Sequence, residues 1–122
     1  MVRALFDTNI LIDHLNAVSA ARAEFARYRG KAISIIAWIE VLVGAKPGSE
    51  AATRSFLDQR FDIIGLDERV AERAVELRKQ HRLKLPDAVI WASAQVHGML
   101  LVTRNTKDFP SDDPGIRMPY QL

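Results

Sequence analysis

Three carboxylates stand alone in otherwise uncharged stretches of this sequence, and their isolation points to chemistry. They are Asp7 within 4–12, Glu40 within 32–45 and Asp87, the one acid within 85–102. These stretches are the most apolar of the chain, so we expect them to form the core. A carboxylate in a core is costly unless it is paired, hydrogen-bonded or bound to a cation. Three such acids in one small chain indicate a shared metal ion.

Each acid also has an ordinary structural explanation when it is taken singly. Asp7 is suited to cap a following helix, and Asp87 follows Pro86 in a first helical turn, where the helix dipole favours an acid. Asp108 lies in a loop, where many acids are caps or are solvated. Glu40 is the hardest to explain in this way, because its helix is apolar nearly all round. Considered together, the four acids favour a metal site.

The elements that must position these acids follow from hydrophobic periodicity and from the places of glycine and proline. Strands are expected at 2–6, 31–35, 61–65 and 99–103, with a short edge strand at 115–119. Helices are expected at 10–15, 17–29, 37–45, 50–59, 67–81 and 87–97. Thr8 or Asn9 would cap the first helix, and Gly30 would end the second. This alternation predicts an α/β fold of three layers, a short and mostly parallel sheet flanked by helices on both faces.

Ligands of a parallel sheet bind outside the carboxyl ends of its strands, and this rule brings the four acids together. Asp7 ends the first strand, and Glu40 lies in the helix after the second. Asp87 begins a late helix, and Asp108 follows the fourth strand. An all-oxygen ligand set without His or Cys suits Mg²⁺, with Mn²⁺ as a substitute, rather than zinc.

Composition and charge limit the class of protein. The 122 residues are expected to form a single domain, 1–122, and no cysteine is present for a disulfide, a thiolate zinc site or a nucleophile. No signal peptide or membrane span is evident, so we expect a cytoplasmic protein. If four acids converge, the other 11 acids against 17 Lys and Arg leave +6 on the rest of the molecule, which favours a polyanionic partner. Arg104 and Lys107 could hold phosphates or be solvated loop charges.

Four segments resemble, in order and spacing, the motifs of PIN-domain ribonucleases, and in particular of VapC-type toxins from bacterial toxin–antitoxin systems. They are DTNILI at 7–12, IEVLVG at 39–44, LPDAVIWA at 85–92 and LVTRNTKDF at 101–109. Each motif alone is weak evidence, and the four together are specific. The resemblance implies a PIN-like fold and an endoribonuclease that hydrolyses RNA phosphodiester bonds, in tRNA or another structured or loop RNA, with a Mg²⁺-activated water.

The resemblance also assigns roles by motif. The implied catalytic acids are Asp7, Glu40, Asp87 and Asp108, of which Asp7, Asp87 and Glu40 hold the metal. Some relatives have their last acid where this chain has Asn105, so the fourth place belongs to Asp108 or to Asn105. The residues that would orient these ligands or contact substrate are Thr8, Thr103, Arg104 and Asn105. The implied partners are RNA, a small VapB-like antitoxin and a second copy of the chain in a homodimer, with no membrane.

Other protein classes also place an aspartate at the end of a first strand. A phosphatase of the haloacid dehalogenase type needs a second acid two residues later, but position 9 is Asn. A receiver domain needs an adjacent acid pair and a lysine after a late strand, and neither is evident. A PIN-like module that binds RNA or protein without cutting remains open, although an intact set of acids argues against it.

Overall fold

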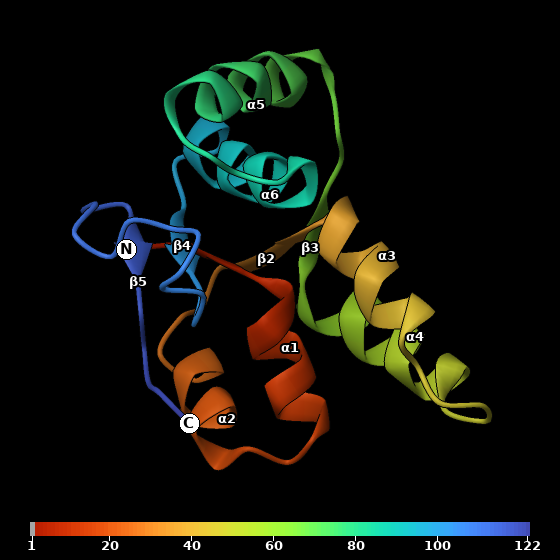
Figure 1. The fold of residues 1–122 in the computed structure, drawn as a ribbon. Coiled ribbons are helices and arrows are strands. Elements are labelled where there is room, and N and C mark those ends of the chain that lie inside the picture. Colours follow the sequence, from red (N-terminus) through yellow and green to blue (C-terminus); the bar gives the residue numbers. More distant parts are fainter. Residues whose placement is uncertain (1) are drawn as a thin grey trace.

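The computed structural model describes residues 2–122, whose strands and helices alternate along the chain (Figure 1). The strands are β1 (Ala4–Phe6), β2 (Lys31–Ser34), β3 (Asp62–Ile64), β4 (Leu100–Val102) and β5 (Ile116–Arg117). The helices are α1 (Thr8–Leu15), α2 (Ser19–Phe25), α3 (Ile35–Val43), α4 (Glu50–Arg60), α5 (Glu68–Gln80) and α6 (Leu85–Val96). None of the helices in this described part is long and apolar enough to cross a membrane.

The five strands form one sheet in the order β3-β2-β1-β4-β5, and every neighbouring pair is parallel. Parallel strands need crossover connections, which the helices supply. The central strand β1 lies between β2 and β4, so the chain segments that leave these three strands start side by side. The predicted α/β fold with a mostly parallel sheet is confirmed, and its carboxyl edge gathers residues that are far apart in the sequence.

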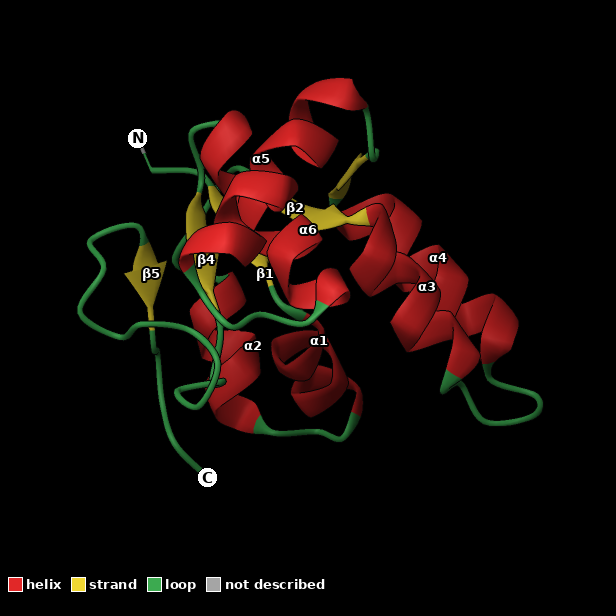
Figure 2. Cartoon of the chain, turned by 45° about the horizontal axis from the view of Figure 1, so that its top comes forward, coloured by secondary structure: helices red, strands yellow, loops and turns green. Residues whose placement is uncertain are grey.

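Helices cover both faces of the sheet, because side chains of each strand alternate between two cores. Leu5 of β1 and Leu101 of β4 join one core with α5 and α6. Phe6 and Val102, the next residues along these strands, join the other core with α1 to α4. Figure 1 shows α5 and α6 on the opposite side of the strands from α1 and α2, and Figure 2 shows β1, β2 and β4 among the helices, with β5 at the outer edge of the sheet. These are the three layers that the sequence predicted.

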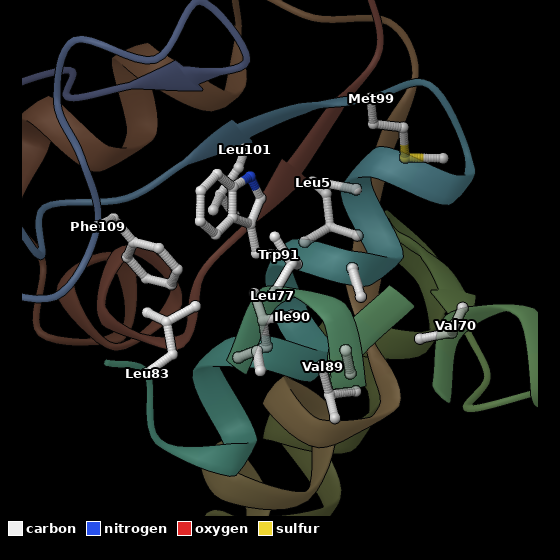
Figure 3. Close-up of a cluster of buried hydrophobic side chains, with 14 of the residues drawn as sticks. Leu5, Val70, Leu77, Leu83, Val89, Ile90, Trp91, Met99, Leu101 and Phe109 are labelled. Carbon is white, nitrogen blue, oxygen red and sulfur yellow. The ribbon is translucent and has the colours of Figure 1, made fainter. Parts of the chain in front are cut away.

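The core beneath α5 and α6 is built around Trp91, which is 2% exposed. Its ring meets the edge of Phe109 with 5.9 Å between centroids, and Leu77, Leu83 and Leu101 belong to the same cluster (Figure 3). Burying side chains of this size stabilises the fold by about 2–3 kcal/mol each. Phe109 lies just past Asp108, so this core anchors one end of the loop that follows β4.

The predicted second helix, 17–29, is too long, and the assignment of Gly30 as its C-cap is wrong. Helix α2 ends at Phe25 with Ala26 as its cap residue. The chain then turns so that the Tyr28 hydroxyl donates to Glu24 Oε2 over 2.9 Å. Glycine at position 30 makes room for Arg3 instead, because a Cβ there would lie 2.8 Å from Cγ of Arg3 and that side chain would have to shift.

The expectation that the whole stretch 32–45 is buried is also wrong. Helix α3 buries only Ala37 and Val41, whereas Ile39 is 45% and Val43 is 81% exposed. An apolar helix of the sequence therefore presents an apolar face to the surface. Such a face is typical of a surface that a partner covers.

Candidate active site

Asp7 is the centre of a hydrogen-bonded cluster at the carboxyl end of β1. It is the N-cap of α1, and its Oδ1 accepts from the Thr8 backbone N–H over 2.8 Å. Its Oδ2 accepts from the Thr103 hydroxyl over 2.7 Å and from the Asn9 amide over 3.2 Å. The cap expected at Thr8 or Asn9 is wrong, and the alternative that Asp7 caps the helix is confirmed. Asp7 caps the helix and faces the candidate site at once.

Burial is the main influence on the Asp7 carboxyl, which is 4% exposed. Removal from water raises the pKa of Asp7 to about 6, against the lowering effect of the hydrogen bonds from Thr103 and Thr8. The charges of Asp87 and Glu40 raise this pKa further. These three acids therefore lie close enough for their charges to interact.

Glu40 lies on α3, the helix that follows β2. Its Oε1 accepts a hydrogen bond of 2.8 Å from the hydroxyl of Thr8, so a residue at the start of α1 orients an acid of α3. The expectation that Glu40 is a buried carboxylate is wrong, because its side chain is exposed on the solvent side of the helix. This hydrogen bond is the geometric basis for the orienting role that the motifs implied for Thr8, and that role stays a prediction.

Asp87 lies in the first turn of α6, directly after Pro86. It is half-buried, and burial together with the charges of Asp108 and Glu40 raises its pKa, while Lys84 lowers it. Within residues 2–122, no side-chain or backbone donor is hydrogen-bonded to its carboxylate. A helix dipole alone would favour the charged form. Burial and the charges of Asp108 and Glu40 act against this preference.

The loop after β4 carries the remaining acid. The Thr103 hydroxyl donates to Asp7 and accepts from the Asn9 amide and from the Asn105 N–H, over 3.2 and 3.0 Å. Asn105 in turn donates from its amide to Asp108 Oδ2 over 3.0 Å, and its Oδ1 accepts from the Asp108 N–H over 3.1 Å. Asn105 thus holds Asp108, and Asp108 is one of the groups whose charge acts on Asp87.

Two residues of this edge make contacts that the sequence did not specify. The guanidinium of Arg104 is bound to Asp13 over 2.6 and 2.9 Å and does not face the four acids as a free phosphate ligand. Asn9 was given no role beyond a possible cap, yet it bridges Asp7, Thr103 and the Arg104 N–H. Its place in the motif DTNILI was the signal that could have revealed it.

Comparisons with known proteins place this geometry in a family. The family model described as PIN domain matches residues 4–111. The chain belongs to the PIN domain family. It is 32% identical over 116 residues to "Ribonuclease VapC4" of Mycobacterium tuberculosis, covering 84% of this chain and 86% of that protein. It is 30% identical over 120 residues to "tRNA(fMet)-specific endonuclease VapC" of Shigella flexneri, covering 89% and 91%.

A solved structure agrees with these relatives. The chain matches a protein in "Toxin-antitoxin complex from Klebsiella pneumoniae" with a TM-score of 0.91 and 48% identity, over 98% of this chain and 99% of that one. The prediction of a PIN-domain nuclease of the VapC type is confirmed. Nucleases of this kind generally depend on a divalent metal. The acids of this PIN domain must therefore suit a divalent cation.

The donor chemistry of the site fits a hard divalent cation. Across residues 2–122, no three His, Cys, Asp or Glu side chains already stand in an arrangement that would hold a metal ion. Four carboxylates nevertheless share one edge, and the pKa of Asp7 and of Asp87 is raised by burial first and by neighbouring acids in addition. A cation relieves this repulsion, and oxygen donors alone suit Mg²⁺ or Mn²⁺. Because Glu40 and Asp87 are at least partly exposed, their side chains can turn toward Asp7 without disturbing the core.

Proposed function

We propose that this PIN-domain protein is a Mg²⁺-dependent endoribonuclease and the toxin of a VapBC-type pair, with Mn²⁺ as a substitute metal. The observation that carries the proposal is the convergence of Asp7, Glu40, Asp87 and Asp108 at the carboxyl edge of the sheet, with two raised pKa values among them. Repulsion among carboxylates has a cost that only a bound cation or a proton removes.

Asp7, Glu40 and Asp87 would hold the metal, and Asp108 completes the acidic edge. A bound Mg²⁺ would neutralise the phosphodiester and lower the pKa of a coordinated water. The residues around it supply orientation. Thr103 and the Thr8 N–H hold the two oxygens of Asp7, and the Thr8 hydroxyl holds Glu40. Hydrogen bonds to metal ligands typically contribute about 10- to 100-fold to metal affinity or activity.

RNA is the substrate class that the surroundings of the acids support. Lys84 lies close enough to lower the pKa of Asp87, and Lys107 is exposed on the loop that carries Asp108. Cations at the border of an acidic site attract phosphates on either side of the bond that is cut. The relatives named ribonuclease and tRNA(fMet)-specific endonuclease agree with this class, and we propose a loop of a structured RNA as the target.

Cleavage of RNA by the purified protein tests the activity. We expect cleavage with Mg²⁺ that excess EDTA abolishes, and products with a 5′-phosphate and a 3′-hydroxyl, because an activated water rather than the ribose 2′-hydroxyl attacks. Cleavage that persists in chelator, or 2′,3′-cyclic phosphate ends, would contradict this mechanism. Tight RNA binding without any cleavage would favour the non-catalytic PIN-like module.

A VapB-like antitoxin is the partner that the surface supports. A groove of about 440 Å³ lies between α1, α3 and α4, with Ile12, Leu15 and Val41 in its lining, and Ile39 and Val43 are exposed on α3. The matching Klebsiella pneumoniae chain was solved in a toxin–antitoxin complex. We expect an apolar antitoxin segment to fill this groove, while a basic side chain reaches the acids.

Expression with and without the adjacent small reading frame tests the toxin role. The chain alone should slow growth, and the neighbouring frame should relieve this effect and co-purify with the chain. Leu15→Glu, in the lining of the groove, should weaken that co-purification, whereas Val75→Glu, on α5 and also exposed, should not. A harmless chain that captures no product of the neighbouring frame would contradict the toxin role. Light scattering of the free chain would test the homodimer that we also propose.

A further inference from the structure

A second polar cluster lies directly behind the acidic edge and involves Asp13, Arg104 and Tyr120. Arg104 Nε and Nη2 donate to the two oxygens of Asp13 over 2.6 and 2.9 Å. The Tyr120 hydroxyl donates to Asp13 Oδ2 over 2.8 Å. Asp13 is only 5% exposed, and these contacts lower its pKa while they raise that of Arg104. Three parts of the chain thus meet at one buried carboxylate.

The position of Arg104 connects this cluster to the acids of the candidate site. Thr103, the residue before it, donates to Asp7, and Asn105, the residue after it, holds Asp108. The backbone N–H of Arg104 itself donates to Asn9 Oδ1 over 3.2 Å. Both the main chain and the side chain of Arg104 are therefore fixed to α1. A shift of this residue would move Thr103 away from Asp7 and Asp108 away from Asp87.

We infer that Asp13, Arg104 and Tyr120 are positioning residues. They hold the loop 103–108 so that Thr103 stays bonded to Asp7 and Asp108 stays close to Asp87. The inference rests on the proposed metal-dependent activity. Bidentate Arg–carboxylate pairs fix orientation as well as distance. Groups that orient metal ligands typically contribute about 10- to 100-fold to metal affinity or activity.

A phosphate-binding role for Arg104 makes the opposite prediction for its partner. If Arg104 bound RNA, Asp13→Asn would release the guanidinium, and RNA affinity would stay the same or rise. If Arg104 is a positioning residue, Asp13→Asn and Arg104→Gln should cause the same loss. Both variants should then lower metal affinity and kcat about 10- to 100-fold and leave KM for RNA nearly unchanged.

A second buried carboxylate, also bound by an arginine and a tyrosine hydroxyl, serves as a matched control. Arg117 on β5 donates to the two oxygens of buried Glu24 over 2.6 and 3.1 Å, and the Tyr28 hydroxyl donates to the same carboxylate. The side chains of this second cluster contact none of the four site acids. The Arg117 carbonyl accepts from the Thr103 N–H, and this backbone bond survives Arg117→Gln. Loss of stability from a broken buried ion pair should therefore be similar in both clusters.

The experiment measures Mn²⁺ affinity by calorimetry, RNA cleavage kinetics and thermal melts for wild type, Arg104→Gln, Asp13→Asn and Arg117→Gln. We expect Arg104→Gln and Asp13→Asn to lose metal affinity and kcat, with partial rescue in Arg104→Lys, and Arg117→Gln to lose only stability. Equal metal affinity and kcat in Arg104→Gln and Arg117→Gln would overturn the inference. A wild-type protein that neither binds Mn²⁺ nor cleaves RNA would instead overturn the proposed function, and the inference with it.

A milder pair of variants keeps the test valid if loss of an ion pair unfolds the protein. Tyr120→Phe and Tyr28→Phe each remove one hydroxyl that donates to a buried carboxylate, and both leave the ion pair in place. Tyr120→Phe should lower metal affinity and kcat by a smaller factor than Arg104→Gln, and Tyr28→Phe should change neither. Metal affinity and kcat that are unchanged in both, with wild type active, would contradict the positioning role.

Discussion

Asp7 combines a structural role with a place in the candidate site. Asp7 caps α1, accepts from Thr103 and Asn9, and lies almost fully buried beside other acids. Its motif predicted the last of these roles, because Asp7 stands alone in an apolar stretch at the end of a strand. The hydrogen bond from Thr103 depends on a strand pairing across 96 residues of sequence, and no local pattern specifies such a contact.

The raised pKa of Asp7 predicts an unusual pH dependence of the metal-free protein. The folded pKa of about 6 lies above the ordinary 3.8, so the folded state holds this proton more tightly than the unfolded chain. The free energy of unfolding should therefore fall as pH rises from about 4 through about 6, by about 2–3 kcal/mol for this group. Above about pH 7 this loss is complete.

Urea unfolding in EDTA of wild type and Asp7→Asn, at about pH 4 and about pH 7, measures this effect. The amide of the variant does not titrate, so the stability of the variant relative to wild type should increase by about 2–3 kcal/mol between the two pH values. Asp13 and Glu24, whose pKa values are lowered, weaken both proteins equally at low pH. A difference between the two proteins that stays constant with pH would show that Asp7 titrates normally.

At the scale of elements, the sequence predicted every strand and helix. Its errors concern the end of one helix and the burial of another, because tertiary contacts determine both. The 17–29 pattern continues as a helix by periodicity, but Tyr28 turns inward toward Glu24 and Phe6. Helix α3 is apolar on faces that the fold leaves exposed, and burial cannot be inferred from hydrophobicity when a partner is absent. Asp13 and Glu24 likewise look like surface acids in a helix pattern until their arginines are seen.

The junction of α1 and α3 predicts a measurable effect of one hydroxyl. The Thr8 hydroxyl donates to Glu40 Oε1 and so connects the two helices at the site. Thr8→Val keeps the side-chain shape and removes this bond, and cleavage should fall about tenfold or more because Glu40 loses its orientation. Stability should change by less than about 1 kcal/mol, since the pair is exposed.

Thr8→Ser is the control for this change, because it keeps the hydroxyl and should retain cleavage near the wild-type rate. The measurement is a comparison of kcat and of urea unfolding for the three proteins. Equal cleavage by Thr8→Val and wild type would show that Glu40 needs no orientation from α1.

At the scale of the whole molecule, charge separates the acidic edge from the rest of the surface. The sequence carries 17 basic against 15 acidic residues, and acids at Asp7, Glu40, Asp87 and Asp108 gather at one end of the sheet. Two further acids, Asp13 and Glu24, are neutralised by arginines in the interior. What remains outside is more basic than the net charge of +2 indicates, which favours the approach of RNA.

The central claim is that the acids at the carboxyl edge hold a catalytic divalent cation, and Asp87→Asn tests it most directly. Thermal melts of wild type and Asp87→Asn, with and without Mg²⁺, are measured beside RNA cleavage. We expect the variant to lose cleavage, to be as stable as the metal-free wild type or more so because repulsion is relieved, and to gain much less stability from Mg²⁺ than wild type does. The account would be contradicted by a variant that loses about 0.5–1 kcal/mol, as a helix-dipole aspartate would, and that keeps its response to Mg²⁺ and still cuts RNA.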